Sequence, residues 1–214
     1  MDINLIVAGV GGQGSILASH VIAEAAIKLA EQKPGEALNV RVGETFGAAM
    51  RGGAVASHVR IGDVHGPLVG KGQADMIMAL EPLEGLRIGL EYIKQGGIAI
   101  LNTGPIPPVD VMIGAAKYPR AEEITDALRE MGGAVTTLDA TKLAIEAGTA
   151  KAMNVVMLGA AFATGLFPFS EEIMIDAIRE RVPAKFLDVN LKAFALGKQA
   201  YLAGQRGRVA SKEA

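Results

Sequence analysis

The feature that most constrains the fold is a strand–turn–helix unit at the start of the chain. Residues 3–8 form a short apolar run, the pattern of a strand buried on both faces. The glycine cluster GVGGQG follows at residues 9–14, and a helical pattern runs over residues 15–31. Three of the glycines fit G-x-G-x-x-G in the position that the dinucleotide-binding fingerprint requires. We therefore expect an α/β fold that begins with a turn of the phosphate-binding type.

Strands and helices alternate along the rest of the chain. Further strands are predicted at residues 38–42, 54–61, 75–80, 98–101 and 134–138. Helices are predicted at residues 82–94, 119–131, 150–164, 171–180 and 186–203, with one more after Asp139 as its N-cap. This order predicts a Rossmann-like, mainly parallel sheet with helices on both faces and a helical C-terminal part. We expect one domain over residues 1–204 and a flexible polar tail over residues 205–214.

Composition excludes several classes of protein. The 214 residues carry a net charge of −2 and no Cys. Near-neutral charge argues against nucleic-acid binding, and a chain without Cys offers no disulfide, thiolate zinc site, Cys nucleophile or ligand for an iron–sulfur cluster. It fits a reducing compartment, so we expect a cytoplasmic protein.

A membrane span and a signal peptide are not expected. The start of the chain lacks the basic segment of a signal peptide. The uncharged run at residues 152–170 has nearly the length of a membrane helix, but Asn154, Gly165 and Pro168 interrupt it. The run therefore predicts a buried helix that ends near Gly165.

The glycine turn is a candidate anion site. Gly9 would permit the sharp turn, Gly11 would let the backbone approach a phosphate, and Gly14 would allow close packing of helix and strand. The free N–H groups and the dipole of the following helix favour an anion. Gln13 and Ser15 could add side-chain donors. The alternative is that the glycines only make a tight turn.

A standard NAD site is disfavoured, because the ribose-binding acid expected about 20 residues further on is missing. Glu44 lies later, in a second glycine-rich segment at residues 43–53 that also contains Arg51. Two hypotheses stay open for this loop. Arg51 could bind a phosphate or carboxylate through its guanidinium fork, or it could pair with Glu44 and staple the loop. Both place the loop near the carboxyl ends of the first strands, where open α/β sheets bind ligands.

Other polar residues identify no catalytic set. Asn102 and Thr103 end a predicted strand, where they could face a ligand or form an Asx turn. The three histidines show no metal-ligand spacing, and His58 is expected to be a hydrogen-bonded strand residue. We assign no catalytic residue and no metal site, and the chain alone looks catalytically incomplete.

An ordered set of motifs resembles a known family. The segments are GVGGQGSILAS, ETFGAAMRGGAVASHVRIG, ALEPLEGLR, NTGPIPP, NVVMLGA and a final VPAKF…N…AF…G at residues 182–197. Together they resemble the beta subunit of indolepyruvate:ferredoxin oxidoreductase, which is similar to the gamma subunit or domain of the 2-oxoacid:ferredoxin oxidoreductases. The resemblance covers nearly the whole chain.

The resemblance implies a non-autonomous subunit. Enzymes of this family oxidatively decarboxylate 2-oxoacids to acyl-CoA and pass electrons to ferredoxin. Thiamine diphosphate, Mg and the [4Fe-4S] clusters belong to a larger alpha subunit, and CoA is the co-substrate. The small subunit packs against the larger one, meets ferredoxin through the complex and helps to shape the CoA or substrate entrance; a homodimer is an option for the isolated chain.

The motifs and the resemblance together nominate a set of binding residues, and none of them is assigned a catalytic role. The set is Gly9, Gly11, Gly12, Gln13, Gly14, Ser15, Glu44, Arg51, Gly52, Gly53, Asn102 and Thr103.

The second loop departs from the family pattern, because Phe46 and Met50 stand where many members have His and Gln. Aryl pyruvates and other 2-oxoacids therefore stay open as substrates. A stand-alone nucleotide- or CoA-binding module with a regulatory or scaffold role is the alternative function, and a self-standing NAD dehydrogenase ranks third.

Overall fold

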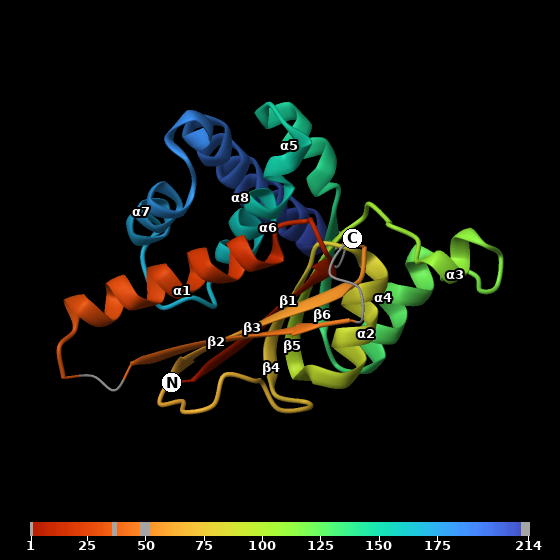
Figure 1. Cartoon of the computed structure of the whole chain (residues 1–214), viewed down its shortest axis with the longest axis horizontal. Coiled ribbons are helices and arrows are strands. Elements are labelled where there is room, and N and C mark those ends of the chain that lie inside the picture. Colours follow the sequence, from red (N-terminus) through yellow and green to blue (C-terminus); the bar gives the residue numbers. More distant parts are fainter. Residues whose placement is uncertain (1, 36–37, 48–51, 211–214) are drawn as a thin grey trace.

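A single six-stranded sheet forms the centre of the molecule (Figure 1). The computed structural model describes residues 2–35, 38–47 and 52–210. The strands are β1 (Ile3–Val10), β2 (Asn39–Phe46), β3 (Ala54–Gly62), β4 (Ala74–Ala79), β5 (Ile93–Asn102) and β6 (Ala134–Leu138). Their order across the sheet is β2-β3-β1-β4-β5-β6.

The sheet is mainly parallel, as predicted. β1, β4, β5 and β6 pair in parallel along this order, while β3 runs antiparallel to both β1 and β2. β2 and β3 are consecutive antiparallel strands, and the connection between them is too short for a crossover, so the two strands form a hairpin. The α/β class is confirmed, and β3 is the one reversed strand.

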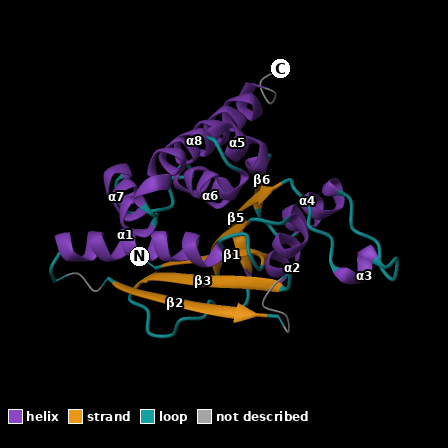
Figure 2. Ribbon diagram, turned by 45° about the horizontal axis from the view of Figure 1, so that its top comes forward, coloured by secondary structure: helices purple, strands orange, loops and turns teal. Residues whose placement is uncertain are grey.

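Helices cover both faces of the sheet, as Figure 2 shows. They are α1 (Ser15–Gln32), α2 (Pro82–Tyr92), α3 (Val109–Met112), α4 (Ala121–Glu130), α5 (Ala140–Ala147), α6 (Met153–Phe162), α7 (Glu171–Arg181) and α8 (Leu187–Ala210). Two 3₁₀ turns, Ala150–Ala152 and Ala184–Phe186, precede α6 and α8. One core lies between the sheet and the side formed by α1 and α5–α8, and a second lies under α2 and α4.

Alternation along the central strands explains the two cores. Leu5 and Val7 of β1 point into the first core, whereas Ile6 between them belongs to the second. Met76 and Ile77 of β4 divide in the same way. A strand whose successive side chains point to opposite faces must be apolar throughout when both faces are covered, which is the pattern that residues 3–8 display.

Several element ends differ from the predicted ones. Gly43 and Glu44 belong to β2 rather than to a loop. α2 ends at Tyr92, because Ile93 is buried and starts β5 directly. Pro119 is not the first helical residue: Arg120 is the N-cap of α4, and its N–H donates to the Glu123 carboxylate.

Two further differences concern the second half of the chain. The short helix α3 was not predicted within the proline-rich connection after β5. α8 continues to Ala210, into the segment expected to be a tail, and residues 211–214 lie outside the described part. The boundary at residue 204 stays a prediction. By contrast, Asp139 caps α5 as predicted, accepting from Lys142 N at 2.8 Å.

The uncharged run near residue 160 forms the buried helix α6, as predicted, and Gly165 follows it with φ +76°. Within the described residues, no helix combines the length and the apolarity needed to cross a membrane.

α6 and α8 cross in direct backbone contact. A Cβ atom at Gly159 of α6 would overlap the carbonyl oxygen of Phe194, and one at Gly197 of α8 would overlap that of Val156. Overlap with a rigid backbone cannot be relieved by rotating a side chain. Glycine at these two positions therefore sets the distance between the two helices.

This crossing predicts opposite effects for two glycines of the same helix. Gly197→Ala should lower the free energy of unfolding by about 2 kcal/mol or more, since overpacking forces the helices apart. Gly204→Ala is the control, because a Cβ atom at that position would meet no other atom within 4 Å, and it should raise stability by up to about 1 kcal/mol through helix propensity. Urea unfolding of both variants measures these changes in the free energy of unfolding. Equal changes for the two variants would contradict the close crossing of α6 and α8.

Candidate functional site

The glycine turn lies where β1 ends and α1 begins, at the carboxyl ends of the parallel strands. Gly12 and Gly14 adopt φ of +105° and +85°, which side chains rarely tolerate. Gly11 N donates to the carbonyl of Gly53 at 2.9 Å. The structure therefore brings together the glycine turn and the end of the second glycine-rich loop.

Gly9 does not make the turn, contrary to the prediction. It lies inside β1, and a Cβ there would come within 2.9 Å of Gln13 Oε1 and 3.1 Å of Leu80 Cβ. The missing side chain makes room for the amide of Gln13, which accepts from Val10 N at 2.8 Å and donates to the carbonyl of Leu80 at 3.0 Å. Gln13 thus closes the turn and anchors it to the end of β4, so its amide is committed to the protein.

The first amides of α1 lack a side-chain cap. Gly14 is the N-cap residue, and no described side chain accepts a hydrogen bond from the first N–H groups of this helix. No acidic residue stands in the first turn. The positive end of the helix dipole and its N–H groups are therefore left for a ligand or water.

A pocket with a volume of about 280 Å³ opens at this helix end. Its described lining residues are Gly11, Gly12, Gly14, Ser15, Ile16, Phe46 and Val55. None of them is ionisable, and both Ile16 and Phe46 are exposed. Such a pocket offers backbone amides to an anion and two apolar side chains to the group that carries it. Arg51 and Met50 lie outside the described residues, so the proposed guanidinium contact is a prediction.

Glu44 lies on β2 beneath α1 and does not line this pocket. Its Oε1 lies 3.4 Å from His20 Nε2 of α1, a distance suited to an ion pair, although the two groups do not align as a hydrogen bond. The same oxygen and the hydroxyl of Ser57, its partner across β2 and β3, are buried without a hydrogen bond in the described part of the molecule. Because Arg51 is not described, its pairing with Glu44 stays open.

Asn102 has a structural role, and its side chain does not point to solvent. It is buried at the end of β5, donates to the carbonyl of Leu80 at 3.0 Å and accepts from Ala140 N of α5 at 3.0 Å. Its amide therefore joins the end of β4 to the start of α5, which is neither the ligand contact nor the Asx turn considered from the sequence. Thr103, the next residue, is exposed and donates its N–H to Leu138.

Asn154 of α6 begins one of the family motifs, but it was not among the predicted binding residues. It is buried, and its Nδ2 donates to the carbonyl of Gly14 at 3.1 Å. A Cβ at Gly14 would come within 2.5 Å of this nitrogen. The signal was present in the sequence, because Asn154 is the single polar side chain of an otherwise apolar helix.

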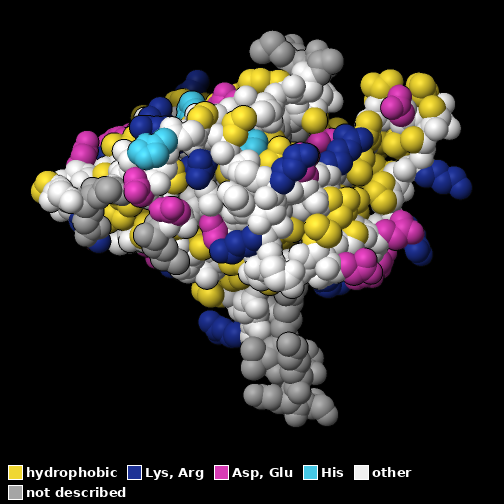
Figure 3. Space-filling model, turned by 90° about the horizontal axis from the view of Figure 1, so that it is seen from below, with side chains coloured by type: hydrophobic (Ala, Val, Ile, Leu, Met, Phe, Trp, Pro, Cys, Tyr) yellow, Lys and Arg dark blue, Asp and Glu magenta, His cyan; other side chains and the backbone are white. Residues whose placement is uncertain are grey.

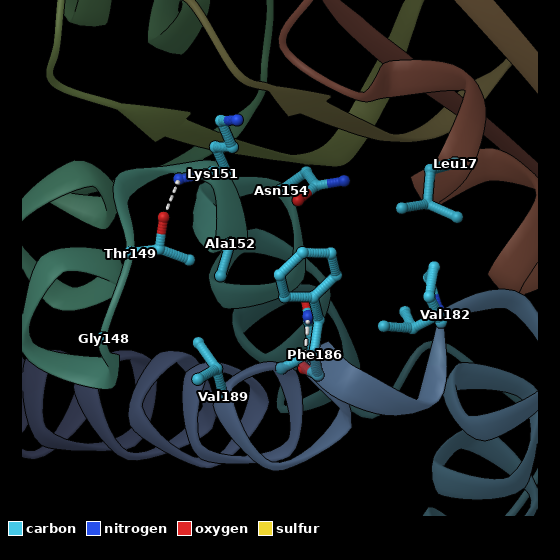
Figure 4. Close-up of a pocket in the computed structure, with 11 residues that line it drawn as sticks. Leu17, Gly148, Thr149, Lys151, Ala152, Asn154, Val182, Phe186 and Val189 are labelled. Carbon is cyan, nitrogen blue, oxygen red and sulfur yellow. Dashed lines mark hydrogen bonds between the residues drawn. The ribbon is translucent and has the colours of Figure 1, made fainter.

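Asn154 also borders a second cavity, of about 450 Å³ (Figure 4). Leu17, Val182, Phe186 and Val189 provide apolar walls, and the Phe186 ring points into the space. Two polar side chains of the lining are bonded within the protein: Asn190 donates to the carbonyl of Phe186, and Thr149 Oγ1 accepts from Lys151 N. The first turn of α1 thus borders two pockets, one lined by Ser15 and Ile16 and the other by Leu17.

The described lining of the pocket at the glycine turn contains no acid–base pair. His58 is buried in β3, where its Nδ1 accepts from Val69 N at 3.2 Å. Burial lowers the pKa of His58, an effect that Glu91 partly opposes. The imidazole is therefore neutral and structural, as predicted. Among the residues that the structure describes, no group of three His, Asp or Glu side chains is arranged to hold a metal ion.

Comparison with known proteins places this geometry in a family. A model of the family described as pyruvate ferredoxin/flavodoxin oxidoreductase matches residues 4–200. The indolepyruvate oxidoreductase subunit IorB of Pyrococcus horikoshii is 44% identical, covering 93% of this chain and 96% of that protein. The same subunit of Archaeoglobus fulgidus is 42% identical, covering 98% of this chain and 100% of that protein.

A solved structure agrees with the sequence matches. The gamma subunit of a keto/oxoacid ferredoxin oxidoreductase from Geobacter sulfurreducens superposes with a TM-score of 0.67 at 27% identity, covering 94% of this chain and 99% of that one. Sequence and fold thus agree over nearly the whole length, and the chain belongs to the pyruvate ferredoxin/flavodoxin oxidoreductase family.

Proposed function

We propose that the chain is the small, non-autonomous subunit of a 2-oxoacid:ferredoxin oxidoreductase whose substrate is indolepyruvate or another aryl pyruvate. The observation that carries the proposal is the end-to-end match, at 42–44% identity, to proteins named as indolepyruvate oxidoreductase subunits. In this reaction the 2-oxoacid loses CO₂ and two electrons, the acyl group passes to CoA, and ferredoxin accepts the electrons.

The redox cofactors belong to the larger subunit in this proposal. Iron–sulfur clusters are held by thiolates, and the sequence contains no Cys. Thiamine diphosphate, held with Mg by the larger subunit, would supply the electron sink that decarboxylation needs. What this chain can contribute is a rigid binding surface, because the described residues near the glycine turn offer donors and apolar walls but no base.

The glycine turn is proposed to hold a phosphate group of CoA. The uncapped start of α1 supports this, as do the open pocket beside Ser15 and the contact of Gly11 with the second loop. Gly52, Gly53 and Arg51 would then border the same ligand, and Thr103 would lie on the loop after β5, two strands away from β1 along the same sheet edge. Gln13 and Asn102, whose amides are engaged within the protein, would position the turn.

The alternative is a stand-alone nucleotide- or CoA-binding module with a regulatory or scaffold role. It shares the anion pocket with the first proposal but needs no partner. Calorimetric titration of the isolated chain with CoA, ADP and NAD, beside an activity assay of the assembled complex, separates the two.

Activity should require both subunits. The isolated chain is expected to reduce no ferredoxin with indolepyruvate and CoA, whereas the chain co-expressed with the larger subunit from the same genome should do so. Phenylpyruvate, 2-oxoisovalerate and pyruvate in the same assay would define the substrate class. Ferredoxin reduction by the isolated chain, or a complex inactive with every 2-oxoacid tested, would contradict the proposal.

A negative charge placed beside the glycine turn should weaken CoA binding. Ile16→Glu introduces a carboxylate at the pocket wall, and we expect it to raise the KM for CoA in the assembled enzyme about tenfold or more through repulsion of the phosphates. The fold should tolerate it, since acidic residues are favourable in the first turn of a helix.

Ile16→Gln is the matched control, because it has the same size and polarity without the charge. Only the Glu variant should show a KM that depends on ionic strength. Equal KM values for the two variants would show that no anionic group of CoA lies at this helix end.

A further inference from the structure

The connection between β5 and α4 projects from the body of the protein as a finger, residues 104–118, with α3 at its tip (Figure 1). None of the residues of α3 is buried, so the helix contributes nothing to the core of the chain. Its fold is local: Ile113 N donates to the carbonyl of Val109, and the N–H groups of Ala115 and Ala116 donate to that of Asp110.

The tip of the finger is apolar. Val109, Met112 and Ile113 are 64%, 68% and 70% exposed, the three highest values among the exposed large hydrophobic residues of the described chain. In Figure 3 a largely yellow projection, with an acidic side chain in magenta, stands at the upper right. Single exposed hydrophobic residues are common, but a cluster displayed on a projection is characteristic of a binding surface.

A buried carboxylate holds the two ends of the finger together. Glu81, at the end of β4, accepts from Ile106 N at 3.2 Å and from the hydroxyl of Tyr118 at 2.5 Å with the same oxygen. The Tyr118 hydroxyl in turn accepts from Leu83 N at 3.2 Å. Burial, together with the Glu81 carboxylate, raises the pKa of Tyr118, so the phenol stays protonated and able to donate.

The contacts of Glu81 with Ile106 and Tyr118 form the stem of the finger, and they make the finger a pre-organised element. Pro105, Pro107 and Pro108 restrict the backbone of its first arm. Since the tip is already ordered before binding, association costs less conformational entropy. The finger thus holds in place exposed apolar side chains that contribute nothing to the core of the chain. This is the arrangement expected of a docking element.

The apolar area of the tip decides between two partners for this surface, a second copy of the chain and a larger protein. Three side chains offer a few hundred Å², well below the roughly 800 Å² per partner that a stable interface buries. A dimer made finger to finger would therefore be too small. The finger fits instead one part of a wider contact, entering an apolar cleft in a larger protein that also covers neighbouring surface. The finger follows β5 and the glycine turn follows β1, so both lie at the carboxyl ends of parallel strands.

We propose that this finger docks into an apolar cleft, with a basic residue at its rim facing Asp110, on the larger subunit of the oxidoreductase. The inference rests on the proposed function, which supplies that subunit. Val109, Met112 and Ile113 fill the cleft, and Glu81 and Tyr118 hold the finger in the bound conformation. The same subunit then covers the sheet edge that carries the glycine turn.

The test measures the dissociation constant of the co-expressed complex by sedimentation velocity over a dilution series. The double variant Met112→Ser, Ile113→Ser should raise the Kd at least tenfold, which corresponds to about 1.4 kcal/mol. Ile145→Ser is the matched control, because Ile145 of α5 is 62% exposed on another element, and it should leave the Kd within about twofold. The Tm of each isolated variant checks that the fold is intact.

A stem variant gives a second readout. Tyr118→Phe should increase hydrogen exchange within residues 104–117 and raise the Kd severalfold without altering the tip. If Tyr118→Phe changes neither the hydrogen exchange of residues 104–117 nor the Kd, the result contradicts the role of the stem.

The other outcomes are distinguishable. An unchanged Kd for the double variant would overturn the docking inference and leave the proposed function standing. Loss of self-association of the isolated chain, with the complex intact, would assign the finger to a second copy and overturn the chosen occupant. Failure of the wild-type chain to bind the larger subunit would contradict both proposals.

Discussion

The carbonyl of Leu80, where β4 ends, is the junction on which the candidate site depends. It accepts the side-chain amides of Gln13 and Asn102, each at 3.0 Å. Gln13 also accepts from the end of β1, and Asn102 is itself the last residue of β5. Three neighbouring parallel strands are thus joined at their carboxyl ends by two amides that share one acceptor. Gly9 has no side chain because a Cβ would displace the first of these amides.

The junction explains why the glycine turn is a rigid platform. The amide of Gln13 anchors the turn to the carbonyl of Leu80. Gly11 N donates to the carbonyl of Gly53, and Asn154 of α6 donates to the carbonyl of Gly14. The first amides of α1 have no side-chain cap and lie beside an open pocket. Pre-organised donors of this kind bind an anion without reorganisation. The chain therefore fits a role as a binding surface for a partner that performs the chemistry.

Much of the fold could be predicted from the sequence, because both faces of the sheet are covered. That coverage makes the strands continuously apolar and sets them apart from the amphipathic helices. The reversed β3 and the length of β2 were harder to predict, since Gly43 and Glu44 resemble loop residues in composition while the hairpin pairing places them in a strand. The finger helix α3 was missed because four residues between prolines and glycine, none of them buried, carry no periodic pattern.

The site was predicted less completely, for a physical reason. Glycine spacing located the turn and the nearby second loop, but it does not reveal where an amide side chain points. Gln13 and Asn102 resemble ligand contacts in sequence, and only tertiary structure shows that they bond to a single carbonyl. Asn154 acts on the turn from 140 positions away in the chain, a separation that no local motif spans.

A double-mutant cycle on this junction tests the account most directly. Gln13→Ala and Asn102→Ala should each lower the free energy of unfolding, but either single variant leaves Leu80 one amide donor. Only the double variant removes both donors from this carbonyl, so its destabilisation should exceed the sum of the two single effects by about 1 kcal/mol. Additivity within about 0.3 kcal/mol in urea unfolding would contradict the claim that one shared acceptor organises the glycine turn.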